Sequence, residues 1–131
     1  MRKQTGPGPE WYIRRDIKLM LEQRNWHVEI MVGSAFQSGI PDLYCFHQDK
    51  WGERWIDAKN PDEYTFTKAQ KFKWPLWERK GIGIWILIAA TQAEYNKLFQ
   101  PPNWRSYVKK NWKLPTPEEI DRMVDELCAD E

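Results

Sequence analysis

Residues 38–59 read SGIPDLYCFHQDKWGERWIDAK, and this stretch decides the fold. The run from Asp42 to His47 is apolar and aromatic enough to form a strand. Residues 49–52 are turn-forming types, and residues 54–59 return as a second strand. The stretch therefore predicts a β-hairpin.

The hairpin places charged side chains close together. Because strand side chains alternate between faces, Asp57 and Lys59 share one face and Ala58 lies on the other. Pro41 stiffens the entry to the first strand, so that Asp42 can lie opposite Asp57. Two neighbouring carboxylates repel each other unless a proton or a cation lies between them, and Mg²⁺ prefers oxygen ligands. With Lys59 orienting a water and neutralising a phosphate, the expected chemistry is metal-assisted attack of water on a phosphodiester.

A simpler interpretation stands beside this one. Asp57 and Lys59 could form an exposed ion pair on a sheet face, with no chemical role. The spacing alone is weak, since it arises readily by chance. The context favours a site, because Gly39 precedes the Pro-Asp pair and a helix and a strand follow the hairpin.

Apolar periodicity predicts an αβββαβα order for the rest of the chain, and hence an α/β domain with a mixed central sheet flanked by helices. Pro75 is expected to kink or break the middle helix. Thr91 and Glu94 have the capping-box pattern. The elements outside the hairpin are a helix over 10–25, a strand over 26–32, a helix from Thr67 to near Gly81 with Ala69, Phe72 and Leu76 facing inward, a strand over 82–89 and a short helix over 91–99.

Charge divides the chain in two. Residues 1–117 carry 19 Lys/Arg and 12 Asp/Glu, a net +7, whereas residues 118–131 carry one Arg and seven acids, a net −6. A basic body suits a polyanionic partner such as nucleic acid.

The nine Trp exceed what a small core usually needs, so they either fill the core or form a stacking surface. We divide the chain into a flexible basic arm (1–9), a core (10–99) and a C-terminal helical extension with an acidic helix (100–131).

The order of three short motifs resembles a nuclease family. Gly39-Ile40-Pro41-Asp42, then Asp57-Ala58-Lys59, then Gln70 in the following helix resemble the PD-(D/E)xK nuclease superfamily, and most of all its small VRR-NUC branch, over residues 10–90. The resemblance implies a restriction-endonuclease-like αβββαβ core and a Mg²⁺- or Mn²⁺-dependent DNA endonuclease. Stand-alone members in phages and bacteria are similar to Holliday-junction resolvases, which act as homodimers on four-way or branched DNA.

The resemblance also implies roles for individual residues. Asp42, Asp57 and the backbone carbonyl of Ala58 would hold the metal, Lys59 would position the attacking water, and Gln70 would support that water or the phosphate. An acid on the first helix would complete the site.

Two residues are candidates for that acid. Glu10 faces the inward stripe of the helix and Asp16 lies off it, although the family acid usually stands about a turn further along, where this chain has Arg14. Glu10 could equally be a solvated first-turn residue. On the next strand, His27 could position a phosphate and Glu29 could reach the metal, but a partly exposed strand histidine is the simpler interpretation.

Partners and location follow as expectations. DNA and a second copy of the chain are the expected partners. No long apolar stretch or secretion signal predicts membrane insertion or export, and Cys45 and Cys128 form no disulfide or metal pattern, so the cytoplasm of a bacterium or a phage-infected host is expected. The alternatives are a non-catalytic DNA-binding module and a protein-interaction module on the same fold.

Overall fold

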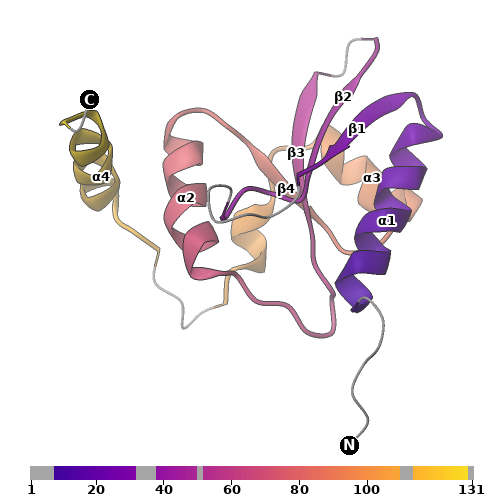
Figure 1. Cartoon of the computed structure of the whole chain (residues 1–131), viewed down its shortest axis with the longest axis horizontal. Coiled ribbons are helices and arrows are strands. Elements are labelled where there is room, and N and C mark those ends of the chain that lie inside the picture. Colours follow the sequence, from indigo (N-terminus) through magenta and orange to yellow (C-terminus); the bar gives the residue numbers. More distant parts are fainter. Residues whose placement is uncertain (1–7, 32–37, 50–51, 110–113, 130–131) are drawn as a thin grey trace, which may run out of the picture.

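A computed structural model describes residues 8–31, 38–49, 52–109 and 114–129 of the chain (Figure 1). The predicted order of helices and strands is confirmed, and within these ranges two short 3₁₀ helices are added to it. The elements in chain order are α1 (Pro9–Glu22), β1 (Trp26–Ile30), β2 (Leu43–His47), β3 (Glu53–Ala58), α2 (Lys68–Arg79), β4 (Ile84–Leu87), α3 (Gln92–Asn96), η2 (Lys97–Phe99), η3 (Trp104–Tyr107) and α4 (Pro117–Ala129).

The four strands form one mixed sheet in the order β1-β2-β3-β4. β1 pairs with β2 and β2 with β3 in antiparallel fashion, whereas β3 and β4 are parallel. In the hairpin, Leu43 lies opposite Ile56, so the next pair outward is Asp42 and Asp57. The register therefore places both carboxylates on one face of the sheet, at the end where β2 begins and β3 ends.

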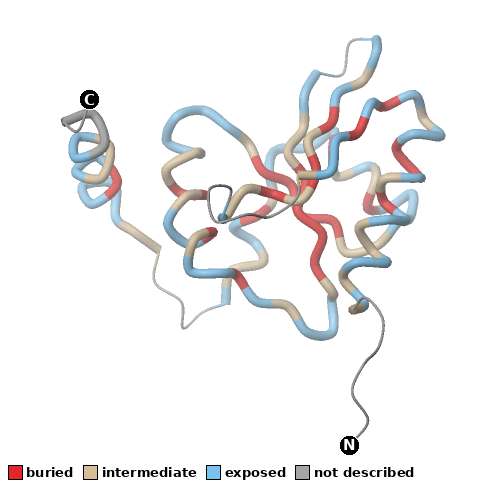
Figure 2. Tube along the Cα trace, in the orientation of Figure 1, coloured by how far each residue is buried: buried red, intermediate tan, exposed pale blue. Residues whose placement is uncertain are grey.

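Helices cover both faces of the sheet (Figure 1). On one face, Ile17 and Leu21 of α1 pack with Leu43 and Ile56 in the first hydrophobic core. On the other face lies the second core, whose buried members are Phe66, Trp74, Ile84, Ile86 and Trp104. Buried residues follow the central strands (Figure 2), so the sheet is the middle layer of an α/β/α arrangement.

Helix α2 departs from the sequence expectation in two ways. Pro75 does not end the helix, which continues through it to Arg79. The inward face carries Gln70 and Trp74 rather than Phe72, which is 45% exposed. Thr67 caps the helix and starts its first turn so that Gln70 and Trp74, four residues apart, point towards the sheet. Pro75 is itself buried beside this face, although it cannot donate the helical hydrogen bond.

The C-terminal extension packs on the core. Trp104 is buried and meets Trp74 edge to face, with ring centroids 5.9 Å apart. Asn103 pairs with both backbone groups of Ile86 and so covers the outer edge of β4. The acidic helix α4 lies beside α2 (Figure 1), where Asp121 accepts a 3.0 Å hydrogen bond from Arg79.

Six of the seven described tryptophans belong to the two cores or pack against them. Four of them, Trp26, Trp74, Trp85 and Trp104, are buried. Trp51 and Trp112 lie outside the described residues, as do residues 1–7 of the predicted basic arm.

Within the described ranges, no helix combines the length and the apolar character needed to cross a membrane.

A glycine at the site end of the sheet allows α2 to approach closely. Gly39 has a φ of 84°, and a Cβ added there would lie 2.8 Å from the backbone carbon and oxygen of Ala69. We expect Gly39→Ala to lower the free energy of unfolding by about 2–3 kcal/mol, because both backbone strain and a backbone clash oppose it. Urea denaturation measures the change.

Gly81→Ala is the matched control. Gly81 also has a positive φ, 91°, but an added Cβ there would meet nothing within 4 Å. We expect only the conformational cost of about 1 kcal/mol at this position. Equal losses for the two variants would show that close packing of α2 on residue 39 is unimportant.

Candidate active site

Asp42 and Asp57 are held side by side by the backbone. The amide of Asp42 donates to Oδ1 of Asp57 at 3.2 Å, and the amide of Ala58 donates to Oδ2 of Asp42 at 3.0 Å. Each carboxylate thus accepts a hydrogen bond from the opposite strand, which fixes its orientation. The hairpin prediction brought together the two residues that the structure also brings together.

Lys59 is enclosed behind these carboxylates. Its Nζ lies 3.0 Å from Oδ2 of Asp57 and donates to the carbonyl of Thr65 at 3.0 Å and to Oε1 of Gln70 at 3.1 Å. The rings of Phe66 and Trp74 lie 5.0 and 5.7 Å from the ammonium. Lys59 is only 3% exposed and Asp57 only 1%. The alternative of a solvent-exposed Asp57–Lys59 pair is therefore wrong.

Gln70 positions the lysine through a helix cap. Its side-chain Oε1 accepts from the backbone amide of Thr67 at 3.0 Å, while the backbone amide of Gln70 donates to the Thr67 hydroxyl at 3.1 Å, which completes a capping box. The same Oε1 also accepts from Lys59. Because the cap fixes the first turn of α2, it also fixes one oxygen around the buried ammonium.

Helix α1 brings two charged side chains to the site. Nη1 of Arg14 lies 3.8 Å from Oδ1 of Asp42, and Glu10, one turn earlier, is close enough for Lys59 and Asp42 to influence its pKa. Asp16 instead lies at the exposed surface, paired with Arg15 at 2.9 Å. Of the two acids that the sequence left open, the structure places Glu10 beside the site.

Arg14 was recognised in the sequence only as a departure from the family pattern. A signal for its position was present, because residues four apart on a helix share one face and Arg14 follows Glu10 by four. The aromatic walls from Phe66 and Trp74 had no such local signal. Their positions depend on how α2 packs against the sheet.

Burial and mutual repulsion make these carboxylates hard to ionise. Burial, together with the charge of Asp42, raises the pKa of Asp57 to about 7, although Lys59 opposes the shift. Burial also raises the pKa of Asp42, against the Ala58 amide and the Arg14 charge. Burial likewise raises the pKa of Glu10. Ionising all three carboxyls is therefore costly in the site as it stands, and an added cation would lower that cost.

The donor set fits a hard divalent ion. Within the described residues, Oδ2 of Asp57 is buried and accepts no hydrogen bond of good geometry, its contact with Lys59 being an ion pair. The same described ranges contain no ready-made cluster of three or more His, Cys, Asp or Glu side chains around one point. Asp42 and Asp57 could ligate an ion, and Glu10 is the third acid near them. Ala58 contacts the site through its amide, and its carbonyl stays a predicted ligand.

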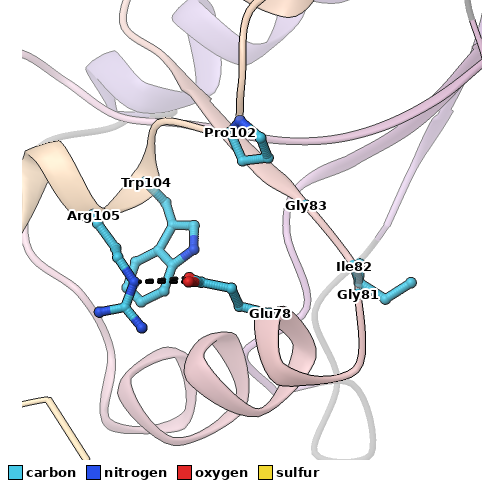
Figure 3. A pocket seen from close by; sticks show the side chains of 7 residues that line it. All are labelled: Glu78, Gly81, Ile82, Gly83, Pro102, Trp104 and Arg105. Atoms are coloured by element: carbon cyan, nitrogen blue, oxygen red, sulfur yellow. Dashed lines mark hydrogen bonds and ion pairs between the residues drawn. The ribbon is translucent and has the colours of Figure 1, made fainter.

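Other features lie away from this site. Nε2 of His27 lies 2.7 Å from Glu29, and the His27 ring stacks on Phe46, so both polar residues lie on the exposed face of β1 rather than at the carboxylates. A pocket of about 270 Å³ lies between the end of α2 and η3 (Figure 3), where Arg105 donates to Glu78. None of the three acidic residues of the site lines it.

The raised pKa of Asp57 makes stability depend on pH. The folded carboxyl has a pKa of about 7 against an ordinary value of 3.8, so between these pH values the folded protein binds more protons than the unfolded chain. The stabilisation is full below about pH 4 and is lost as the pH rises through 7. We expect the free energy of unfolding of the metal-free wild type to fall more between pH 5 and pH 8 than that of Asp57→Asn. Urea denaturation at both pH values tests this, and equal pH slopes would contradict it.

Comparisons with known proteins add nothing to this geometry. No protein-family model, curated protein or solved structure matches the chain significantly. The function must therefore be argued from the site itself.

Proposed function

We propose that this chain is a Mg²⁺- or Mn²⁺-dependent DNA endonuclease of the PD-(D/E)xK type, with a restriction-endonuclease-like core. One observation carries the proposal: two facing carboxylates, each bonded to the opposite strand, lie against a lysine that is itself buried. Partly compensated negative charge at this place suits a divalent ion. The order of the motifs along the chain is the second support.

Each residue of the site has its own role in the proposed reaction. Asp42 and Asp57 are the metal ligands, and Glu10 joins them directly or through a water. When bound, Mg²⁺ supplies a water that loses its proton more easily and neutralises charge on the phosphate. Lys59 balances the charge of ionised Asp57 and so favours its ionised form, and Gln70 holds Lys59 in place.

We further propose branched DNA, such as a four-way junction, as the substrate of a homodimer. A small domain with one site needs a second copy to cut two strands symmetrically. The excess of basic residues before residue 118 supports DNA as the partner. Such an enzyme would work in the cytoplasm of a bacterium or a phage-infected host.

A non-catalytic DNA-binding module is the second candidate, and one observation favours it. The Lys59 ammonium donates two hydrogen bonds to oxygens of the chain and forms an ion pair with a third, as in a lysine with a purely structural role. In such a module the ion pair would serve the fold alone. Metal-dependent cleavage distinguishes the two candidates.

Cleavage is tested on linear duplex, single-stranded, flap and four-way-junction DNA, with and without Mg²⁺ or Mn²⁺. We expect metal-dependent cutting by the wild type and a loss of about a hundredfold or more in rate for Asp57→Asn, because a metal ligand is weakened. Asp49→Asn, in the exposed hairpin turn, should cut at the wild-type rate. If the wild type cuts none of these substrates with either metal, the enzyme proposal is wrong.

The two acids of α1 give a second test. Isothermal titration with Mg²⁺ should show an affinity about tenfold weaker for Glu10→Gln than for wild type, because a carboxylate beside the ion is neutralised. Asp16→Asn removes the same charge from the same helix at an exposed position and should change the affinity less than about twofold. Equal effects of the two substitutions would remove Glu10 from the site.

A further inference from the structure

The two cations of the site, Lys59 and Arg14, differ in how many of their N–H donors already contact the protein. The ammonium of Lys59 has three protons, and three oxygens lie within 3.1 Å of it. Arg14 has a guanidinium with five N–H donors, and none of them forms a hydrogen bond within the described residues. Its one ionic contact there is the 3.8 Å approach to Asp42.

Exposure separates the two cations in the same way. The Lys59 and Asp57 side chains are 4% and 1% exposed, whereas those of Arg14 and Asp42 are 27% and 20% exposed. A group arriving from solvent therefore meets Arg14 and Asp42 before it could reach Lys59. Moving Lys59 outward would break its bonds to Thr65 and Gln70 and leave the charge of Asp57 unbalanced.

We propose that Arg14, rather than Lys59, is the residue that binds the substrate phosphate, through its guanidinium and the non-bridging oxygens of the scissile phosphodiester. The inference rests on the proposed function and names the phosphate contact within it. The planar, forked guanidinium matches two phosphate oxygens, and its contact with Asp42 places it beside the metal ligand.

The charge count supports one metal ion at this site. The carboxylates of Glu10, Asp42 and Asp57 face the cations Arg14 and Lys59, so the ionised group has a net charge of −1. One divalent ion makes it +1, which a single phosphodiester neutralises. A second divalent ion would raise the net charge of the same group to +3, and the guanidinium of Arg14 would add to the repulsion. Arg14 thus supplies positive charge that a second ion would otherwise bring.

The experiment compares Arg14→Ala and Arg14→Lys with Arg15→Ala. Arg15 is the adjacent arginine, lies at the surface and pairs with Asp16, so its removal changes the net charge equally. Three quantities are measured: kcat/KM for cleavage with Mg²⁺, affinity for fluorescent junction and duplex DNA with Ca²⁺ in place of Mg²⁺, and affinity for Mg²⁺ alone by calorimetry. Arg14→Gln replaces Arg14→Ala if the alanine variant does not fold.

We expect Arg14→Ala to lower kcat/KM by about 10²–10³-fold, since one preorganised donor group at the reacting phosphate is lost. DNA affinity in Ca²⁺ should fall about tenfold, while Arg15→Ala should change both by less than about twofold. Arg14→Lys should recover part of the loss, because it restores the charge but not the fork. Mg²⁺ affinity without DNA should stay equal or rise, at one ion per chain, because a cation beside Asp42 has been removed.

Two results would overturn the inference. One is cleavage and DNA binding by Arg14→Ala at the level of Arg15→Ala. The other is a loss of Mg²⁺ affinity in Arg14→Ala that accounts for its loss of activity, which would make Arg14 a positioning residue for Asp42. If the wild type cuts no DNA, the nuclease proposal fails separately. DNA binding in Ca²⁺ that depends on Arg14 would still support its phosphate contact.

Discussion

The structure depends on keeping one ammonium charged inside the protein. Removing an ion from water costs several kcal/mol even after the surroundings relax, and the cost is recovered only if its partners are placed well. For Lys59 those partners come from three places: Asp57 on β3, Thr65 on the connection to α2, and Gln70 in the first turn of α2. The buried charge therefore fixes the end of the hairpin, the path that follows it and the start of the next helix. The contacts that form the candidate site therefore also hold these parts of the fold together.

Local rules were sufficient for the parts of the site that lie on the hairpin. Strand alternation and antiparallel pairing act over a few residues, so the sequence could place Asp42 opposite Asp57 and Lys59 on the same face. The capping boxes show where such rules stop. Thr67-x-x-Gln70 and Thr91-x-x-Glu94 are equivalent patterns, and each threonine caps its helix. Only the side chain of Gln70 also accepts a hydrogen bond from the backbone amide of its capping threonine. The carboxylate of Glu94 instead accepts from the amide of Ile88 and pairs with Lys97.

The features that the sequence did not predict are set by contacts between distant segments. Phe72 was expected inside and is outside, because the inward face of α2 is selected by the cap at Thr67 and by the packing of Trp74 against Trp104. Asn103 could not be assigned to the edge of β4 from its neighbours in sequence. In the sequence, Arg14 stands where the family pattern has an acid, and only the structure shows that it lies close to Asp42. In each case one decisive partner, Trp104, Ile86 or Asp42, lies far along the chain.

The energetics of the carboxylates argue against a purely structural role. A fold gains little from a buried acid that faces a second, partly buried one, since burial raises the pKa of both and the charge of Asp42 adds to the shift at Asp57. Apolar residues of similar size at such positions are often as stable as a buried ion pair, or more so. A lysine that needs a counter-ion explains Asp57 but not Asp42, whose Oδ1 meets only a partly exposed arginine at 3.8 Å within the described residues. The second carboxylate is the part of the arrangement that stability leaves unexplained, and this supports the proposal of a divalent cation and a phosphate substrate at the site.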